Sequence, residues 1–237
     1  MRLSNKKTII AIIIANVMLV LFAIAGKMLT RFDYEDHLDD TVISVDGTDI
    51  TLREFGYYIY MIESFVQNQA LLYDPENPKH WWNTHFSAGP DSQFVCDYAK
   101  KVALNTCICD QIYYEEAVKS GIGPEEALTS QTIGEARALY LNMTPLQLEA
   151  TGLDEELIIE MHNRHVIASK YAKKLSGEQN FIKYDKEPDE LLNWDGEYYQ
   201  EEILPKHEVT ISDKILRKIT LGKITVNRDS TNPTVSR

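Results

Sequence analysis

The sequence predicts a mainly α-helical protein: an N-terminal membrane helix followed by a helical domain with a small β element formed by N- and C-terminal strands. Three observations support this fold class: an uncharged apolar run near the start, long stretches with apolar residues every three or four positions, and short segments rich in Ile, Val and Thr. We divide the chain into an anchor or signal segment (residues 1–31), a helical domain (32–226) and a disordered tail (227–237).

The N-terminal segment has the length and the flanks of a membrane helix. Residues 8–25 carry no charge, and eighteen residues of helix are about 27 Å long, close to the thickness of a bilayer core. Arg2, Lys6 and Lys7 precede this run, and such a basic flank stays in the cytoplasm, so the bulk of the chain is expected on the extracytoplasmic side of a cell membrane. Residues 23–25 also resemble a cleavage site, which leaves a removed signal peptide as an alternative; a buried core helix is a third interpretation.

The charge balance argues against nucleic acid as a partner. The chain has 24 basic and 36 acidic residues, and five of the basic ones lie within residues 1–31, which contain no acidic residue. The remainder therefore has 19 basic against 36 acidic residues, a net charge of −17. Phosphate backbones require clustered Lys and Arg, so we expect no nucleic-acid binding.

A β-hairpin and a long helix are predicted at the start of the domain. The dipeptide Asp46-Gly47 separates two apolar segments, and Asp-Gly is a strong signal for a hairpin turn. Thr51 and Glu54 then have the spacing of a capping box, which indicates a helix start. Apolar residues continue at helical spacing to about residue 73, where the sequence DPENP ends the helix.

Further helices and strands follow from similar signals. We expect helices that start after the caps Asp91, Thr144 and Asp154 and end at the glycines 121, 152 and 177, with another start at Pro124 and a short helical piece through Trp194, Tyr198 and Tyr199. Residues 79–90 are expected to be a loop. The segments HEVTI (207–211) and LRKITLGKITV (216–226) are rich in Ile, Val and Thr, and we expect both to be strands that pair with the early segment 42–45.

Cysteine and histidine give no sign of a disulfide or a metal site. Cys96 and Cys107 would lie about 16 Å apart along one helix, too far for a disulfide, and Cys107 and Cys109 point in different directions. His162 and His165 could share a helix face, but no further ligands accompany them. We therefore interpret the cysteines as small buried residues, and the histidines as surface residues, and expect no metal and no cofactor.

The candidate binding residues are aromatic. Trp81, Trp82 and Phe86 fall in a segment with loop character, and Tyr57 and Tyr58 precede them on the predicted helix. Aromatic rings provide a large contact area at a small cost in conformational entropy, so these residues are candidates for binding extended peptides. The alternative interpretation is that the rings only close the end of the helical core. No catalytic motif occurs, such as a phosphate-binding glycine loop, a nucleophile elbow or His-Glu-x-x-His, and we expect no catalytic residues.

The order of these segments resembles the SurA/PrsA-type extracytoplasmic foldases. The similarity lies in the residues 42–51 with Glu54, Phe55 and Tyr58, and in the segments 117–122, 170–175, 198–199, 207–209 and 221–226. The similarity thus extends over about residues 41–226, and the motifs that carry it are short and degenerate. The resemblance implies a chaperone-like helical domain that holds unfolded exported chains, with N- and C-terminal pieces that meet.

The chain departs from this family at one point. Many members carry a parvulin prolyl-isomerase domain of about a hundred residues, whereas only residues 176–197 occupy the corresponding interval here. The resemblance therefore implies a membrane-anchored, non-catalytic chaperone or foldase-like protein whose partners are unfolded or secreted polypeptides. A non-enzymatic interaction subunit of a membrane or cell-surface complex is the alternative, and a residual peptidyl-prolyl isomerase the third.

Overall fold

The structure is a computed structural model that describes residues 16–20, 32–87, 89 and 92–228. The chain divides into two units, residues 1–33 and residues 34–237. Within the first unit, residues 16–20 form a helix, while the other parts of the predicted membrane segment, 8–15 and 21–25, lie outside the described residues. Among the described residues, no helix combines the length and apolar character needed to cross a bilayer.

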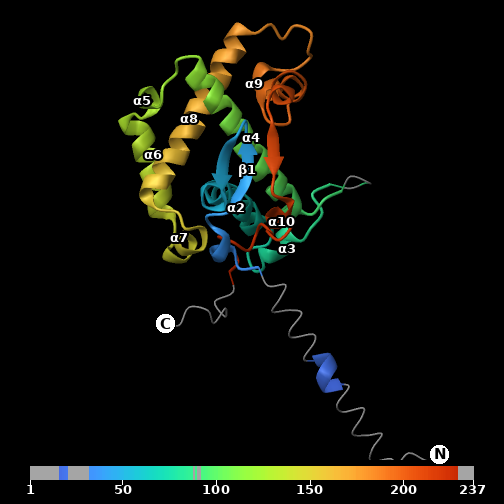
Figure 1. The fold of residues 1–237 in the computed structure, drawn as a ribbon. Helices are drawn as coiled ribbons and strands as arrows, with labels where there is room; N and C mark the ends of the chain where they lie inside the picture. The colour runs from blue at the N-terminus through green and yellow to red at the C-terminus, as the bar shows by residue number, and fades with distance from the viewer. Residues whose placement is uncertain (1–15, 21–31, 88, 90–91, 229–237) are drawn as a thin grey trace, which may run out of the picture. The chain divides into compact units, whose positions relative to one another are not determined.

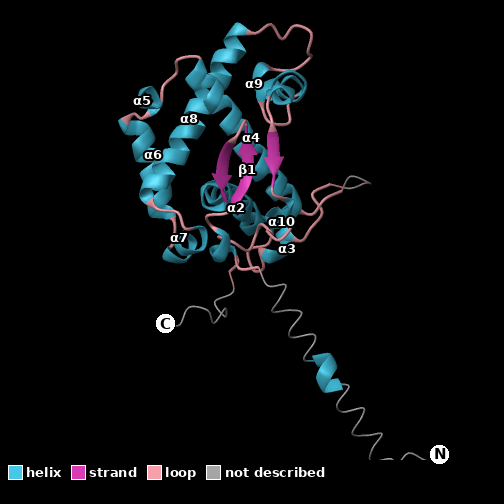
Figure 2. Ribbon diagram, viewed as in Figure 1, coloured by secondary structure: helices cyan, strands magenta, loops and turns pink. Residues whose placement is uncertain are grey.

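The second unit is mainly helical with one small sheet, as the sequence predicts (Figures 1 and 2). Its helices are α2 (Leu52–Tyr73), α3 (Lys79–Trp82), α4 (Val95–Lys119), α5 (Pro124–Ala127), α6 (Ser130–Asn142), α7 (Pro145–Thr151), α8 (Glu155–Glu178), α9 (Pro188–Leu192) and α10 (Asp213–Leu216). The shorter turns are η1 (Tyr34–His37), the π-helical η2 (Tyr199–Ile203) and η3 (Leu204–Lys206). The strands are β1 (Thr41–Val45), β2 (Thr48–Thr51) and β3 (Val209–Ile211).

The sheet joins the two ends of this unit. β1 and β2 form the predicted hairpin, in which Asp46 and Gly47 both have positive φ (49° and 87°). β3 pairs antiparallel with the other side of β1, so the strand order is β2-β1-β3 and the prediction that the segment 207–211 pairs with the early strand is confirmed. Asp46 fixes this contact, because its carboxylate accepts hydrogen bonds from the Glu208 N–H and pairs with the His207 ring, each at 2.7 Å.

The prediction of a second C-terminal strand at residues 216–226 is wrong. The structure has the end of α10 there, followed by turns. The cause is Glu63 on α2, whose side chain is fully buried. Its carboxylate accepts hydrogen bonds from the backbone N–H groups of residues 222–225 and from the Thr225 hydroxyl, at distances of 2.5–3.3 Å. Since these N–H groups bind a side chain, they are not available for a β ladder.

Several local predictions are confirmed at the helix ends. Thr51 and Glu54 form the capping box of α2, and Asp154 caps α8. α7 ends at Gly152, which has the left-handed conformation (φ 65°). Three expectations need correction, and the first two concern helix positions. α4 starts after Phe94 rather than near Asp91, which lies outside the described residues. α3 lies within the segment 79–90 that we expected to be a loop.

The third correction concerns the expected disordered tail, since its first two residues belong to the folded unit. Asn227 hydrogen-bonds Gln67 at 3.1–3.3 Å, and Arg228 pairs with Glu35 at 2.6 Å. The other tail residues, 229–237, lie outside the described residues.

Three long helices form the framework of the core. α4 packs along α8, α2 packs against α4, and α6 covers a further side of α8 (Figure 1). The largest fully buried side chains come from these helices, from the hairpin and from the C-terminal segment: Tyr199, Phe55, Ile43, Ile50, Leu52, Ile59, Ile112, Ile158, Met161, Ile167, Leu191 and Ile219. α9 packs against α8, the Tyr113–Leu192 hydrogen bond joins the end of α9 to α4, and a groove lies between the three helices.

Candidate functional site

The five predicted peptide-binding residues do not form one surface. Tyr57, Tyr58 and Trp82 are buried, with only 2%, 4% and 3% of their surface exposed. Trp81 is partly buried, and Phe86 is 57% exposed. The prediction of an open aromatic surface is therefore wrong for Tyr57, Tyr58 and Trp82, which belong to the core as the alternative interpretation states.

The contacts of the buried rings explain their position. The Tyr57 hydroxyl hydrogen-bonds the His162 Nδ1 at 3.0 Å, and Trp82 donates its indole N–H to the Gln67 side chain at 2.8 Å. Two separate ring pairs remain nearer the surface, Trp81 with Tyr73 and Phe86 with Tyr98, with centroids 4.7 and 4.3 Å apart.

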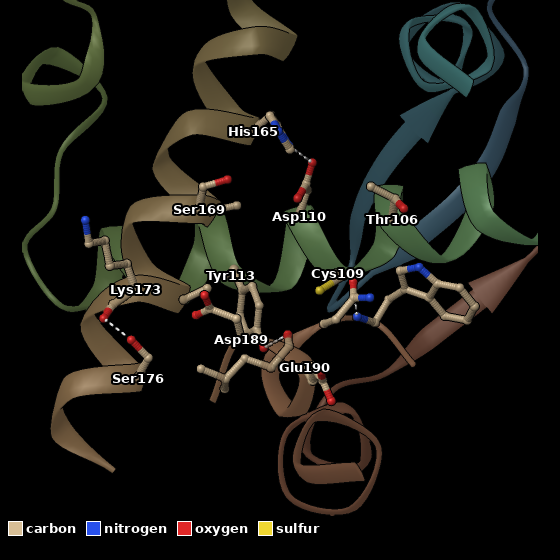
Figure 3. A pocket seen from close by; sticks show the side chains of 15 residues that line it. Thr106, Cys109, Asp110, Tyr113, His165, Ser169, Lys173, Ser176, Asp189 and Glu190 are labelled. Carbon is tan, nitrogen blue, oxygen red and sulfur yellow. Dashed lines mark hydrogen bonds and ion pairs between the residues drawn. The ribbon is translucent and has the colours of Figure 1, made fainter. Parts of the chain in front are cut away.

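A larger concave feature lies between α4, α8 and α9. It is an open groove with a volume of about 790 Å³. Its lining residues come from three segments that are far apart in the sequence: Thr106, Cys109, Asp110 and Tyr113 on α4; His165, Ala168, Ser169, Ala172, Lys173 and Ser176 on α8; and Asp189, Glu190, Leu192, Asn193 and Trp194 on and after α9 (Figure 3).

The centre of the groove combines small and apolar side chains. Ala168, Ala172 and Ser176 follow one another at intervals of four on α8 and leave space beside the helix backbone. Opposite them, the Tyr113 hydroxyl donates a 2.6 Å hydrogen bond to the backbone carbonyl of Leu192, which holds the C-terminal end of α9 against α4. The groove is thus kept open by small residues on one side and a fixed segment on the other.

An ion pair connects two walls of the groove. The Nδ1 atom of His165 on α8 lies 2.7 Å from the Asp110 carboxylate on α4 (Figure 3). The hydrogen bond that the His165 ring donates to Asp110, together with the negative charge of this carboxylate, raises the pKa of His165 above the ordinary value of 6.5. The sequence-based interpretation of His165 as an ordinary surface histidine is therefore incomplete, because its ring joins two helices.

The thiol in the groove lining is not activated by its surroundings. Burial raises the pKa of the Cys109 thiol well above its ordinary value, so the sulfur stays protonated and is a weak nucleophile. Among the described residues, no group of three or more His, Cys, Asp and Glu side chains is arranged to hold a metal ion. All three cysteines are free, in line with the prediction that none of them pair.

The exposed charges of the groove lining come from α8 and α9. Asp189 and Glu190 are exposed on α9, and Lys173 is exposed on α8. In Figure 3 the Lys173 side chain is turned away from the two carboxylates. These charged groups are open to solvent.

Sequence reasoning missed this groove because no single segment contains it. One signal was present: the small residues Ala168, Ala172 and Ser176 repeat at four-residue spacing within the predicted helix. Their partner wall, residues 189–194, could not be assigned to them without the fold. Comparisons with protein-family models, with curated proteins and with solved structures gave no match to this chain.

Proposed function

We propose that the protein is a membrane-anchored, extracytoplasmic chaperone or foldase-like protein that binds unfolded exported polypeptides without catalysis. The observation that carries this proposal is the groove between α4, α8 and α9, whose volume of about 790 Å³ is within the range of about 300–1,000 Å³ common for binding sites. The apolar residues 8–25, with their basic flank, support the anchor.

The lining suits an extended chain better than a small polar ligand. The partly exposed Ala172 allows a backbone to approach α8 closely, while the partly exposed Trp194 supplies ring surface. Asn193 and Ser169 add hydrogen-bond partners that do not select for a particular side chain. Such a lining favours binding of many sequences, which a chaperone requires.

Aggregation of an unfolded model protein tests the proposal. We expect residues 32–237, at equimolar ratio, to slow the rise in light scattering of a chemically denatured client after dilution, since bound apolar segments are withdrawn from self-association. An unchanged scattering trace at this ratio would contradict the proposal.

Co-purification separates this function from that of an interaction subunit. Full-length protein should recover many exported chains, each in less than stoichiometric amount, if it acts as a chaperone. A single stoichiometric partner would instead show a dedicated subunit and contradict the chaperone proposal.

A further inference from the structure

The outer edge of the sheet carries backbone groups without a partner. β3 is the last strand in the order β2-β1-β3, and Figure 2 shows it at the border of the sheet. The Glu208 carbonyl and the Ser212 N–H bond to residues of β1 and its turn. Peptide groups alternate along an antiparallel strand, so those of Val209 and Ile211 point away from β1. Within the described residues, the N–H and C=O groups of Val209 and Ile211 form no hydrogen bond.

The residues of β3 do not protect this edge against pairing. Edge strands of native sheets are commonly blocked by charged side chains, proline or bulges. Residues 209–211 are Val, Thr and Ile, and their register with β1 is regular. Ile211 keeps 41% of its surface exposed, although its side chain lies on the same face of the sheet as that of the buried Ile43 opposite it. An added strand therefore covers both free peptide groups and an exposed apolar side chain.

The strand is complementary to a second copy of itself. When two β3 strands pair antiparallel about Thr210, Val209 lies opposite Ile211 of the second copy and Ile211 lies opposite its Val209. In this register the free N–H and C=O groups of each strand bond to those of the other. The β-branched side chains pack in cross-strand pairs, and the two copies of Thr210 form a Thr–Thr pair, which stabilises sheets. Each position of the strand thus meets a suitable partner.

The charges around the strand also fit a second copy. Residues 209–211 carry no charge, although the whole chain has a net charge of −12. The same register places Glu208 opposite Ser212 of the second copy, so like charges do not face each other at positions 208–212. An unrelated strand would have to supply an apolar residue at both ends and an uncharged centre, and β3 itself has both. These matches favour a second copy over an unrelated chain at this edge.

We propose that the protein forms a symmetric dimer in which the β3 strands of two copies pair antiparallel. The two sheets then join into one, with the strand order β2-β1-β3-β3-β1-β2. The same patch contacts itself on both copies, which is the commonest arrangement in homodimers. This dimer involves neither the groove nor the binding of unfolded chains, so it stands or falls independently of the proposed function.

A disulfide between the two copies tests the pairing directly. In the proposed register the two Thr210 residues face each other as a pair without mutual backbone hydrogen bonds. The Cα atoms of such a pair lie about 4.5 Å apart, a distance that a disulfide can bridge. We expect the full-length Thr210→Cys chain, in an uncharged detergent, to become mostly covalent dimer under mild oxidation.

Two controls show whether the disulfide reports on β3. Asp49→Cys places a thiol at an exposed position of β2, on the same face of the sheet as Thr210, and should stay monomeric. The unmodified chain controls for disulfides through the partly buried Cys96. No covalent dimer from Thr210→Cys, or equal yields from Thr210→Cys and Asp49→Cys, would overturn the proposal.

Sedimentation equilibrium of the full-length chain tests the dimer without added cysteines. Ile211→Lys should weaken dimerisation at least about tenfold, because lysine on an edge strand opposes pairing. Ile182→Lys makes the same change at an exposed residue outside the sheet and should dimerise like the unmodified chain. A dimer of equal strength in Ile211→Lys would place the interface elsewhere, and a monomer at all concentrations would exclude the dimer; either result overturns the proposal.

Discussion

Glu63 shows how a single buried residue determines the path of the C-terminal segment. Its carboxylate is the common acceptor for residues 222–225, so removal leaves several buried donors without a partner. We expect Glu63→Ala to lower the free energy of unfolding by about 3 kcal/mol in urea denaturation, and Glu63→Gln to cost less because one oxygen remains. Glu149→Ala, at an exposed position of α7, is the control. Equal stability of Glu63→Ala and the control would show that the carboxylate does not hold this segment.

His165 makes stability depend on pH. Its hydrogen bond to Asp110 raises its pKa in the folded state above the ordinary value of 6.5. A raised pKa means that the stabilisation is fully present below about pH 6.5 and is lost as the pH rises through the folded-state pKa. NMR titration should give a higher pKa for His165 in the unmodified protein than in Asp110→Asn. An identical pKa in both proteins would refute the assigned cause.

At the scale of elements, the close approach of the C-terminal segment to α3 constrains Gly222. Its φ is +91°, and a Cβ atom there would lie 2.5 Å from the Trp82 ring. Gly222→Ala should therefore lower the free energy of unfolding by about 3 kcal/mol in urea denaturation. Gly123→Ala is the matched control, because Gly123 has φ −80° and nothing within 4 Å of its added Cβ. A Gly222→Ala protein as stable as this control would contradict the packing.

The elements that sequence predicted correctly are those with local signals. The Asp46-Gly47 turn and the capping box of Thr51 and Glu54 depend on neighbouring residues, and both are present. The strand expected at 216–226 failed because a carboxylate from more than 150 positions earlier binds its backbone. The groove could not be predicted for the same reason, since its walls meet only after α4, α8 and α9 have packed.

At the scale of the whole molecule, the folded unit brings its N- and C-terminal pieces together. β3 pairs with β1, and Arg228 pairs with Glu35 across 193 positions of sequence. This pairing leaves the middle of the chain, α4 to α9, to form the groove.

A substitution that fills the groove should separate binding from folding. Ala172→Trp places a large side chain in the groove, so we expect the affinity for a labelled unfolded polypeptide to fall at least about tenfold in fluorescence anisotropy. Ala138→Trp makes the same change at an exposed position of α6, outside the lining, and should bind normally. Equal binding by both variants would show that the groove is not the binding site.

Photo-crosslinking gives the most direct test of the central claim that the groove holds unfolded chains. A photoreactive phenylalanine analogue is placed at position 172, in the groove, or at position 138, on α6, and each protein is irradiated with an unfolded client. We expect client adducts from position 172 and none above background from position 138. Adducts of equal yield from both positions, or none from position 172, would contradict this claim.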